Sequence, residues 1–227
     1  MSKTIVISLG GSIVVPGKVN TRFLKGFRKL IIPQIKKRFR FIIIVGGGKT
    51  CRDYQKAASK ITKLTSEDID WLGIHTTRLN AHLLRTIFRE YSHRRVIKNP
   101  TEKNIKFREK ILVAAGWKPG WSTDYDAVML AKNFHIKTII NLTNISHVYN
   151  KDPKKHKDAK PLKRLSWQGY RKIVGSKWDP GLNLPFDPVA SKVAQKLKLK
   201  VVILKGTNLK NLENFLNGKG FVGTTIG

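Results

Sequence analysis

Short apolar runs recur along the chain and alternate with segments whose apolar residues return at helical spacing. The runs are rich in β-branched residues, and several end at glycine, which is typical of buried β-strands. The predicted strands span Lys3 to Leu9, Arg40 to Val45, Lys110 to Ala115, Lys137 to Leu142 and Lys200 to Lys205, with a last short strand around Phe221 to Ile226.

The segments between these runs predict amphipathic helices. The first begins near Asn20 or Thr21, either of which would serve as its N-cap, and Pro33 is expected to kink or end it. The other predicted helices run from the glycines at 46–48 to Lys60, from Glu67 to Tyr91, from Thr123 to Phe134, from Asp187 to Leu197 and from Leu209 to Leu216.

Strands and helices alternate, and the strands are apolar throughout. Strands of this kind form a mostly parallel sheet that helices cover on both faces, so we predict an α/β fold, a three-layer sandwich. The length of 227 residues suits one domain, 1–227. Residues 146–165 are rich in Lys, Asp and Pro and are expected to form an exposed loop or hairpin.

Glycine-rich turns follow two of the predicted strands, at 10–12 and at 46–48. Ligands of open α/β sheets bind beyond the carboxyl ends of the strands, where glycine lets backbone N–H groups approach a phosphate. Lys49 and Arg52 would add full positive charges. The simpler alternative is a pair of tight turns. Neither turn has the Walker or dinucleotide spacing, since position 43 is Ile43 where the Walker pattern needs glycine.

Charge is the most unusual feature of the composition, with 45 Lys and Arg against 14 Asp and Glu and a formal net charge of +31. Hydrophobic residues make up 41%, which excludes a disordered chain. No apolar run approaches the ~20 residues of a membrane span, and the N-terminus lacks a signal-peptide pattern. A single cysteine, Cys51, excludes an internal disulfide framework. We therefore predict a soluble, cytoplasmic protein that attracts anions.

Six motifs occur in a characteristic order: GGS at 10–12, IIIVGGGKTCRDY at 42–54, DIDWLGIHTTRLNAHLL at 68–84, AAGWKPGWSTDYDAV at 114–128, NLTNISHVYNKDP at 141–153 and FDPVASKVA at 186–194. With this set, the chain resembles the amino acid kinase superfamily, and within it the archaeal type of uridylate (UMP) kinase. The resemblance implies transfer of the γ-phosphoryl group of ATP to UMP, with Mg²⁺, by a homohexamer of amino acid kinase-like fold.

The resemblance also implies a role for individual residues. The residues expected at ATP are Gly11, Ser12, Gly48, Arg52, Thr143, Asn144, Tyr149 and Asp152. Those expected at UMP are Gly47, Asp70, Trp117, Lys118, Pro119, Gly120, Trp121, Ser122 and Thr123. The residues expected at the reaction centre are Lys49, Arg52 and Asp187.

Two departures from the family pattern stand out. Many members carry a lysine where this chain has Ser8, and an acidic-glycine pair where it has Ser146-His147. Isopentenyl phosphate kinases, which are relatives of this family, carry a His soon after the glycine triplet. This chain has Lys49-Thr50-Cys51 there, so isopentenyl phosphate is the second choice of acceptor.

Several other residues have open interpretations. Cys51, whose pKa a helix N-terminus and nearby cations would lower, is interpreted first as a packed bystander. His75 and His82 are interpreted as structural or surface residues rather than metal ligands. Arg78 and Asn80 are equally compatible with a role at the acceptor or between subunits.

The charge leaves two rival hypotheses for the whole protein. One is a binding or assembly protein on a kinase scaffold that recruits nucleic acid without reading sequence. The other is an engineered, positively supercharged kinase, because the acids concentrate near the motifs while basic runs such as residues 36–38 fall in solvent-facing stretches.

Overall fold

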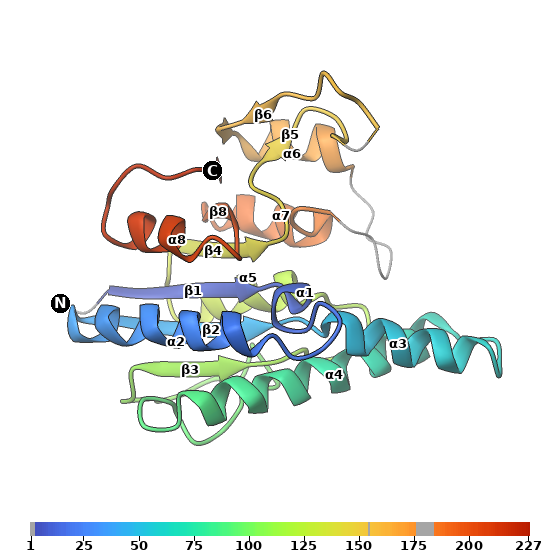
Figure 1. The fold of residues 1–227 in the computed structure, drawn as a ribbon, viewed down its shortest axis with the longest axis horizontal. Coiled ribbons are helices and arrows are strands. Elements are labelled where there is room, and N and C mark those ends of the chain that lie inside the picture. Colours follow the sequence, from blue (N-terminus) through green and yellow to red (C-terminus); the bar gives the residue numbers. More distant parts are fainter. Residues whose placement is uncertain (1–2, 154, 176–183) are drawn as a thin grey trace.

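The computed structural model describes residues 3–153, 155–175 and 184–227, which are arranged around a seven-stranded sheet (Figure 1). The strand order is β3-β2-β1-β4-β8-β9-β7. The first five strands in this order are parallel, β9 runs antiparallel to β8, and β7 pairs in parallel with β9. The strands span β1 Lys3–Leu9, β2 Phe39–Val45, β3 Ile111–Ala114, β4 Thr138–Thr143, β7 Arg164–Leu165, β8 Lys200–Lys205 and β9 Thr224–Ile226.

The helices connect the strands, and polar side chains cap several of them. They span α1 Gly11–Val14, α2 Thr21–Lys36, α3 Gly48–Ser59, α4 Ser66–Ile87, α5 Thr123–Asn133, α6 Trp167–Val174, α7 Pro188–Lys196 and α8 Leu209–Leu216. Asn20, and not Thr21, is the N-cap of α2. Thr65 starts α4 with a capping box, and Ser122 and Asp187 cap α5 and α7.

Alternation along the strands divides the core into two layers, one on each face of the sheet. In β1, Ile5 and Ile7 pack with α2 and α8, whereas Val6 packs on the opposite face with α5 and α7. Burying each such side chain stabilises the fold by about 1.5–3 kcal/mol. The predicted α/β fold, a mostly parallel sheet with helices on both faces, is therefore confirmed.

The element boundaries differ from the prediction in a few places. Pro33 lies inside α2, which continues to Lys36, so it does not end the helix. The helix expected to reach Tyr91 ends at Ile87, because the following chain turns to pair with β3. The helix α6 was not predicted, and the last strand is shorter than expected.

The expected excursion at 146–165 is a small hairpin of two antiparallel strands, β5 Val148–Tyr149 and β6 Pro161–Leu162, followed by β7 at the sheet edge. It stands above the carboxyl end of β4 in Figure 1. Among the residues that the structure describes, none of the helices has the length and apolar content needed to cross a bilayer.

Candidate active site

The two glycine turns meet where the parallel strands β1 and β2 end. A Cβ on Gly11 would lie 2.2 Å from the amide nitrogen of Gly48, and one on Gly48 would lie 2.5 Å from the carbonyl oxygen of Gly11. Gly48 also has a positive φ of 70°. The amide of Lys49 donates to the carbonyl of Val15 (2.8 Å), which joins the turns further. Both glycines are thus required by backbone packing, whatever else the turns bind.

Asn80 holds the second glycine turn from below. This buried α4 residue donates its Nδ2 to the carbonyl oxygens of Gly46 (2.8 Å) and Gly47 (3.1 Å). One amide group thereby fixes two successive carbonyls of the turn. Of the two interpretations left open for Asn80, the structure shows neither directly: its contact is to the turn itself.

A cavity of about 150 Å³ lies beside this turn, between α3, α4 and the loop that follows β3. Its lining residues are Gly46, Gly47, Cys51, Gln55, Ile69, Asp70, Gly73, Ile74, Thr77, Gly116, Trp121 and Thr123. Four of the residues expected at UMP are among them, namely Gly47, Asp70, Trp121 and Thr123. The remaining residues expected there, Trp117 to Gly120 and Ser122, belong to the same loop but do not line the cavity.

The loop is anchored to the helices on either side. The Gly116 amide donates to Thr77 Oγ1 (2.9 Å), and the Gly120 amide donates to Asp70 Oδ2 (2.7 Å). Arg78 donates to the carbonyl of Trp117 (3.0 Å), so its contact is with the loop backbone. Asp70, a residue expected to bind the acceptor, therefore also shapes the loop that closes the cavity.

Aromatic side chains cover the outer part of this loop. The ring of Trp121 packs edge-on against Trp117 (4.6 Å between centroids) and against Tyr125 (4.3 Å). The ammonium of Lys118 lies 4.4 Å from the Trp117 ring centroid and 5.1 Å from that of Trp121, as in a cation–π contact. An aromatic surface with one cation suits a flat, electron-rich or anionic ligand.

Two aspartates lie side by side next to the glycine turns. Asp124, in the first turn of α5, accepts from the hydroxyl of Ser8 (2.9 Å) and from the backbone amide of Asp187 (3.2 Å). Burial, followed by the neighbouring Asp187 carboxylate, raises the pKa of Asp124 to about 7. Asp187 is itself buried and caps α7. A bound cation would offset the cost of ionising Asp124 beside Asp187.

The strand register explains why these polar groups converge. Ser8 and Asn141 are paired across β1 and β4. They follow the buried pair Val6 and Ile139 by two residues, on the same face of the sheet. Asn141 donates to the carbonyl of Pro185 (2.9 Å), which fixes the segment before Asp187. This face of the sheet therefore changes from apolar to polar near the carboxyl ends of β1 and β4, and Asp124 and Asp187 lie at that edge.

The predicted catalytic cations lie further out. Lys49 forms an ion pair with Asp53 one turn along α3, and its side chain is 43% exposed. Arg52 is exposed on the same helix. Neither forms a hydrogen bond or ion pair with Asp124 or Asp187 in the described part of the chain. The structure therefore places them at the rim of the site and not in contact with the acid pair.

The residues expected around ATP come from α1, α3, the end of β4 and the segment after it. Thr143 ends β4 and its hydroxyl donates to the Asn144 side chain (3.3 Å). Tyr149 and Ser146, which differs from the family pattern, share a hydrogen bond between their hydroxyls (3.3 Å). Burial, with Lys163 nearby, lowers the pKa of His147. The carbonyl of Asp152 accepts from the amides of residues 155 and 156, which closes a turn.

Comparison with known proteins assigns the chain to a family. The sequence profile of the amino acid kinase family matches residues 3–205. The chain belongs to the amino acid kinase family. It is 33% identical to a uridylate kinase of Thermoplasma volcanium over 232 residues, covering 100% of this chain and 98% of the relative. It is 34% identical to a uridylate kinase of Methanoregula boonei over 223 residues, or 96% and 93% of the two chains.

Solved structures agree with the sequence comparison. The uridylate kinase of Archaeoglobus fulgidus superimposes with a TM-score of 0.83 at 31% identity, covering 98% of this chain and 99% of that one. The UMP kinase of Bacillus anthracis has the same fold, with a TM-score of 0.77 at 18% identity. This chain is therefore a phosphotransferase of the amino acid kinase fold.

Sequence reasoning missed some residues of this family member's site. Asp124 follows the Ser122-Thr123 pair directly, and its place in the STD motif was a signal that was not used. Ser8, which replaces a lysine found in many members, donates a hydrogen bond to Asp124 and so orients it. Burial raises the pKa of Cys51, which agrees with a packed thiol and corrects the idea of a lowered pKa.

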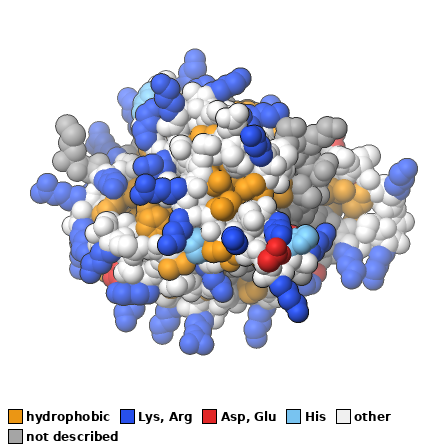
Figure 2. All heavy atoms as spheres, turned by 90° about the horizontal axis from the view of Figure 1, so that it is seen from above, with side chains coloured by type: hydrophobic (Ala, Val, Ile, Leu, Met, Phe, Trp, Pro, Cys, Tyr) orange, Lys and Arg blue, Asp and Glu red, His pale blue; other side chains and the backbone are white. Residues whose placement is uncertain are grey.

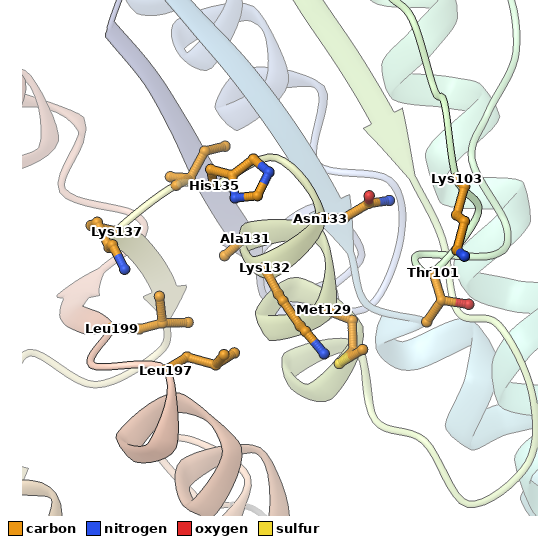
Figure 3. A pocket seen from close by; sticks show the side chains of 11 residues that line it. Thr101, Lys103, Met129, Ala131, Lys132, Asn133, His135, Lys137, Leu197 and Leu199 are labelled. Carbon is orange, nitrogen blue, oxygen red and sulfur yellow. The ribbon is translucent and has the colours of Figure 1, made fainter.

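A second, larger hollow of about 560 Å³ lies at the amino ends of β4 and β8, on the side of the sheet away from the glycine turns (Figure 3). Lys132 and Lys137 reach over it from α5 and the turn that follows, and Lys103 lies on its far side. It has none of the acids or glycine turns that phosphoryl transfer would use. We therefore assign the chemistry to the carboxyl end of the sheet.

Proposed function

We propose that this chain is a uridylate kinase that transfers the γ-phosphoryl group of ATP to UMP and releases ADP and UDP. The observation that carries the proposal is the cavity formed by Gly47, Asp70, Trp121 and Thr123 directly beside two interlocked glycine turns. Full-length similarity to uridylate kinases of Thermoplasma and Methanoregula supports the choice of acceptor. The UDP formed would serve pyrimidine nucleotide synthesis in the cytoplasm.

UMP would occupy the cavity and the aromatic loop. Asp70 Oδ2 accepts from the Gly120 amide, and within the described part of the chain no hydrogen bond reaches Oδ1, which would accept from a ribose hydroxyl. Trp121 would pack on the base, and Lys118 and Arg52 would meet the negative charge of the nucleotide. Such contacts hold the UMP phosphate toward the second glycine turn, which separates the two substrates.

The transfer itself needs positioning and charge neutralisation more than covalent help. A phosphate oxygen of UMP attacks the γ-phosphorus of ATP as the bond to the bridging oxygen of ADP breaks. That phosphate oxygen is already ionised, so no general base is required. Backbone amides of the turns carrying Gly11 and Gly48 would hold the phosphates, with Lys49 and Arg52 closing over them from α3.

The acid pair fits the magnesium ion that accompanies ATP. Asp124 and Asp187 would offer hard carboxylate oxygens to the ion, and its charge would offset the burial and the neighbouring carboxylate that raise the pKa of Asp124. In the described residues, no cluster of three or more His, Cys, Asp or Glu side chains forms a complete metal cage. Bound Mg²⁺ would take ATP phosphates and waters as its other ligands and would neutralise charge on the transferred group.

A coupled assay of ADP and UDP formation tests the proposal. Purified protein with ATP, Mg²⁺ and UMP should produce both products in equal amounts. Asp70→Asn should raise the KM for UMP more than that for ATP. No turnover of UMP, with turnover of isopentenyl phosphate instead, would transfer the site to the second acceptor. Absence of turnover with both acceptors would refute the kinase function.

We also propose that the protein assembles through the outer face of α4, as a homohexamer built from dimers. In a surface dominated by cations, this face carries Trp71 (39% exposed), His75, Leu79 (64% exposed) and His82 at helical spacing. Trp71 and His75 contact each other along this stripe (6.0 Å between centroids). An exposed stripe with few charges favours burial against another subunit.

A second function, binding of polyanions without sequence preference, is favoured by the surface. Figure 2 shows Lys and Arg side chains spread over the visible face with few Asp or Glu. The lysine-lined hollow adds a concave place for phosphate groups. Binding of single-stranded RNA should weaken steeply between low and physiological salt. Undetectable binding at low salt would reject this function.

The origin of the charge is a separate question. A natural relative with acids at the positions of Lys36, Lys56 or Lys60 would favour an engineered origin.

A further inference from the structure

Asp126 is a buried carboxyl that the proposed mechanism does not use. It lies on α5 with none of its surface exposed, between apolar residues of the core layer that contains Ala127 and Val128. One oxygen, Oδ2, accepts from the backbone amide of Trp117 (3.2 Å). The other, Oδ1, is buried without a partner among the residues that the structure describes. A carboxyl in this setting costs stability, so its presence calls for a role.

Trp117 is held at both of its backbone polar groups. Its amide is bound by Asp126 from α5, and its carbonyl by Arg78 from α4 (3.0 Å). It is the first residue of the loop after Gly116, so these bonds fix the direction in which the loop leaves β3. The far side of the loop is held separately, where Asp70 binds Gly120.

The anchored residue leads directly to the acceptor cavity. The ring of Trp117 packs against that of Trp121, which lines the cavity, and Thr123 lines it at the end of the same loop. A shift of the Trp117 backbone would therefore move the wall of the cavity. The glycine turn of Gly11 and the segment after β4 are built from other elements and should not move.

We propose that Asp126 is a positioning residue for the acceptor, which acts through Trp117 to hold residues 117–123 in the shape that receives UMP. This inference rests on the proposed function for the identity of the acceptor. It does not make Asp126 a catalytic residue, since its carboxyl touches the loop and not the cavity. A purely structural role in α5 would predict equal effects on both substrates.

Steady-state kinetics of Asp126→Ala and Asp126→Asn separate these roles, with Glu213→Gln on α8 as the control. The alanine variant should raise the KM for UMP about tenfold, the size expected for one lost buried hydrogen bond, with kcat and the KM for ATP within about threefold. The asparagine variant keeps an acceptor for the Trp117 amide and should stay within about threefold throughout. Equal increases for both nucleotides, or equal losses in both variants, would overturn the proposal.

Two further measurements keep the test decisive. Arg78→Met removes the other anchor without altering α5 and should give the same UMP-selective effect, so an unchanged KM would contradict the proposal if Asp126→Ala does not fold. Hydrogen exchange of the peptide containing Trp117 should be faster in Asp126→Ala than in Asp126→Asn. This readout needs no activity: a wild-type chain that fails to phosphorylate UMP refutes the proposed function, whereas unchanged exchange refutes the anchor.

Discussion

The backbones of Gly11 and Gly48 lie against each other where β1 and β2 end, so close that a Cβ on Gly11 would come 2.2 Å from the Gly48 nitrogen. The two residues are distant in sequence but join neighbouring parallel strands at their carboxyl ends. Their contact brings the two glycine turns into a single unit. Neither turn can be altered without displacing the other.

Gly11→Ala should therefore lower both stability and activity. The added methyl group has backbone atoms on the opposing side and no flexible side chain to displace, so we expect a loss of about 2–3 kcal/mol. Gly17→Ala is a matched control, because a Cβ at Gly17 meets nothing within 4 Å. Urea unfolding of the two variants measures the difference, and equal midpoints would contradict the packing described.

Asn80→Asp should be more damaging than Asn80→Ala. The alanine leaves two turn carbonyls without their donor, at a cost of about 1–3 kcal/mol. The aspartate is of similar size but faces the same carbonyls with acceptor oxygens, which repel them. Thermal unfolding ranks the variants, and assays at saturating UMP would show whether the KM for ATP has changed. An aspartate variant as stable as wild type would disprove the role of Asn80.

The fold could be predicted from the sequence because two signals mark the strands, namely a run of apolar residues and a glycine that ends it. Runs such as Arg40 to Val45 are apolar on both faces, and glycines end them, so their type and position were predicted closely. The helix α6 was missed because Gly169 interrupts its short pattern, while its burial depends on Trp167 and Tyr170 packing into the core layer that contains Val6. Pro33 does not end α2, because the helix packs its apolar face into the core on both sides of this residue.

The site was predicted less completely, because its residues act through partners far away in the chain. The glycine motifs were visible in the sequence, but the contact between Gly11 and Gly48 depends on the pairing of β1 with β2. Asp124 was overlooked because only the strand register brings Ser8 beside it. The role predicted for Asp70 at UMP stays a prediction, although its place in the cavity agrees with it.

Stability should fall as pH rises from about 4 to about 8. The pKa of Asp124 is raised to about 7 and that of Asp126 to about 8, whereas an unfolded aspartate titrates near 3.9. Between these values the unfolded chain releases protons that the folded chain retains, so the free energy of unfolding decreases with pH and levels off above 8. Asp126→Asn should flatten this slope in urea unfolding at pH 5 and pH 8 without nucleotide. An unchanged slope would contradict a protonated Asp126, and Glu90→Gln, at an exposed acid, serves as the control.

Leu79→Glu should dissociate the proposed assembly without unfolding the chain. Leu79 is 64% exposed on the outer face of α4, so a charge there costs little in the monomer but would be buried in a subunit contact. Light scattering should show a smaller mass for this variant, while Val222→Glu, at an exposed residue near the C-terminus, should keep the wild-type mass. Because each subunit carries a net charge of +31, the wild-type assembly should also become more stable as salt screens repulsion. A wild-type protein that is monomeric at every salt concentration would rule out assembly through α4.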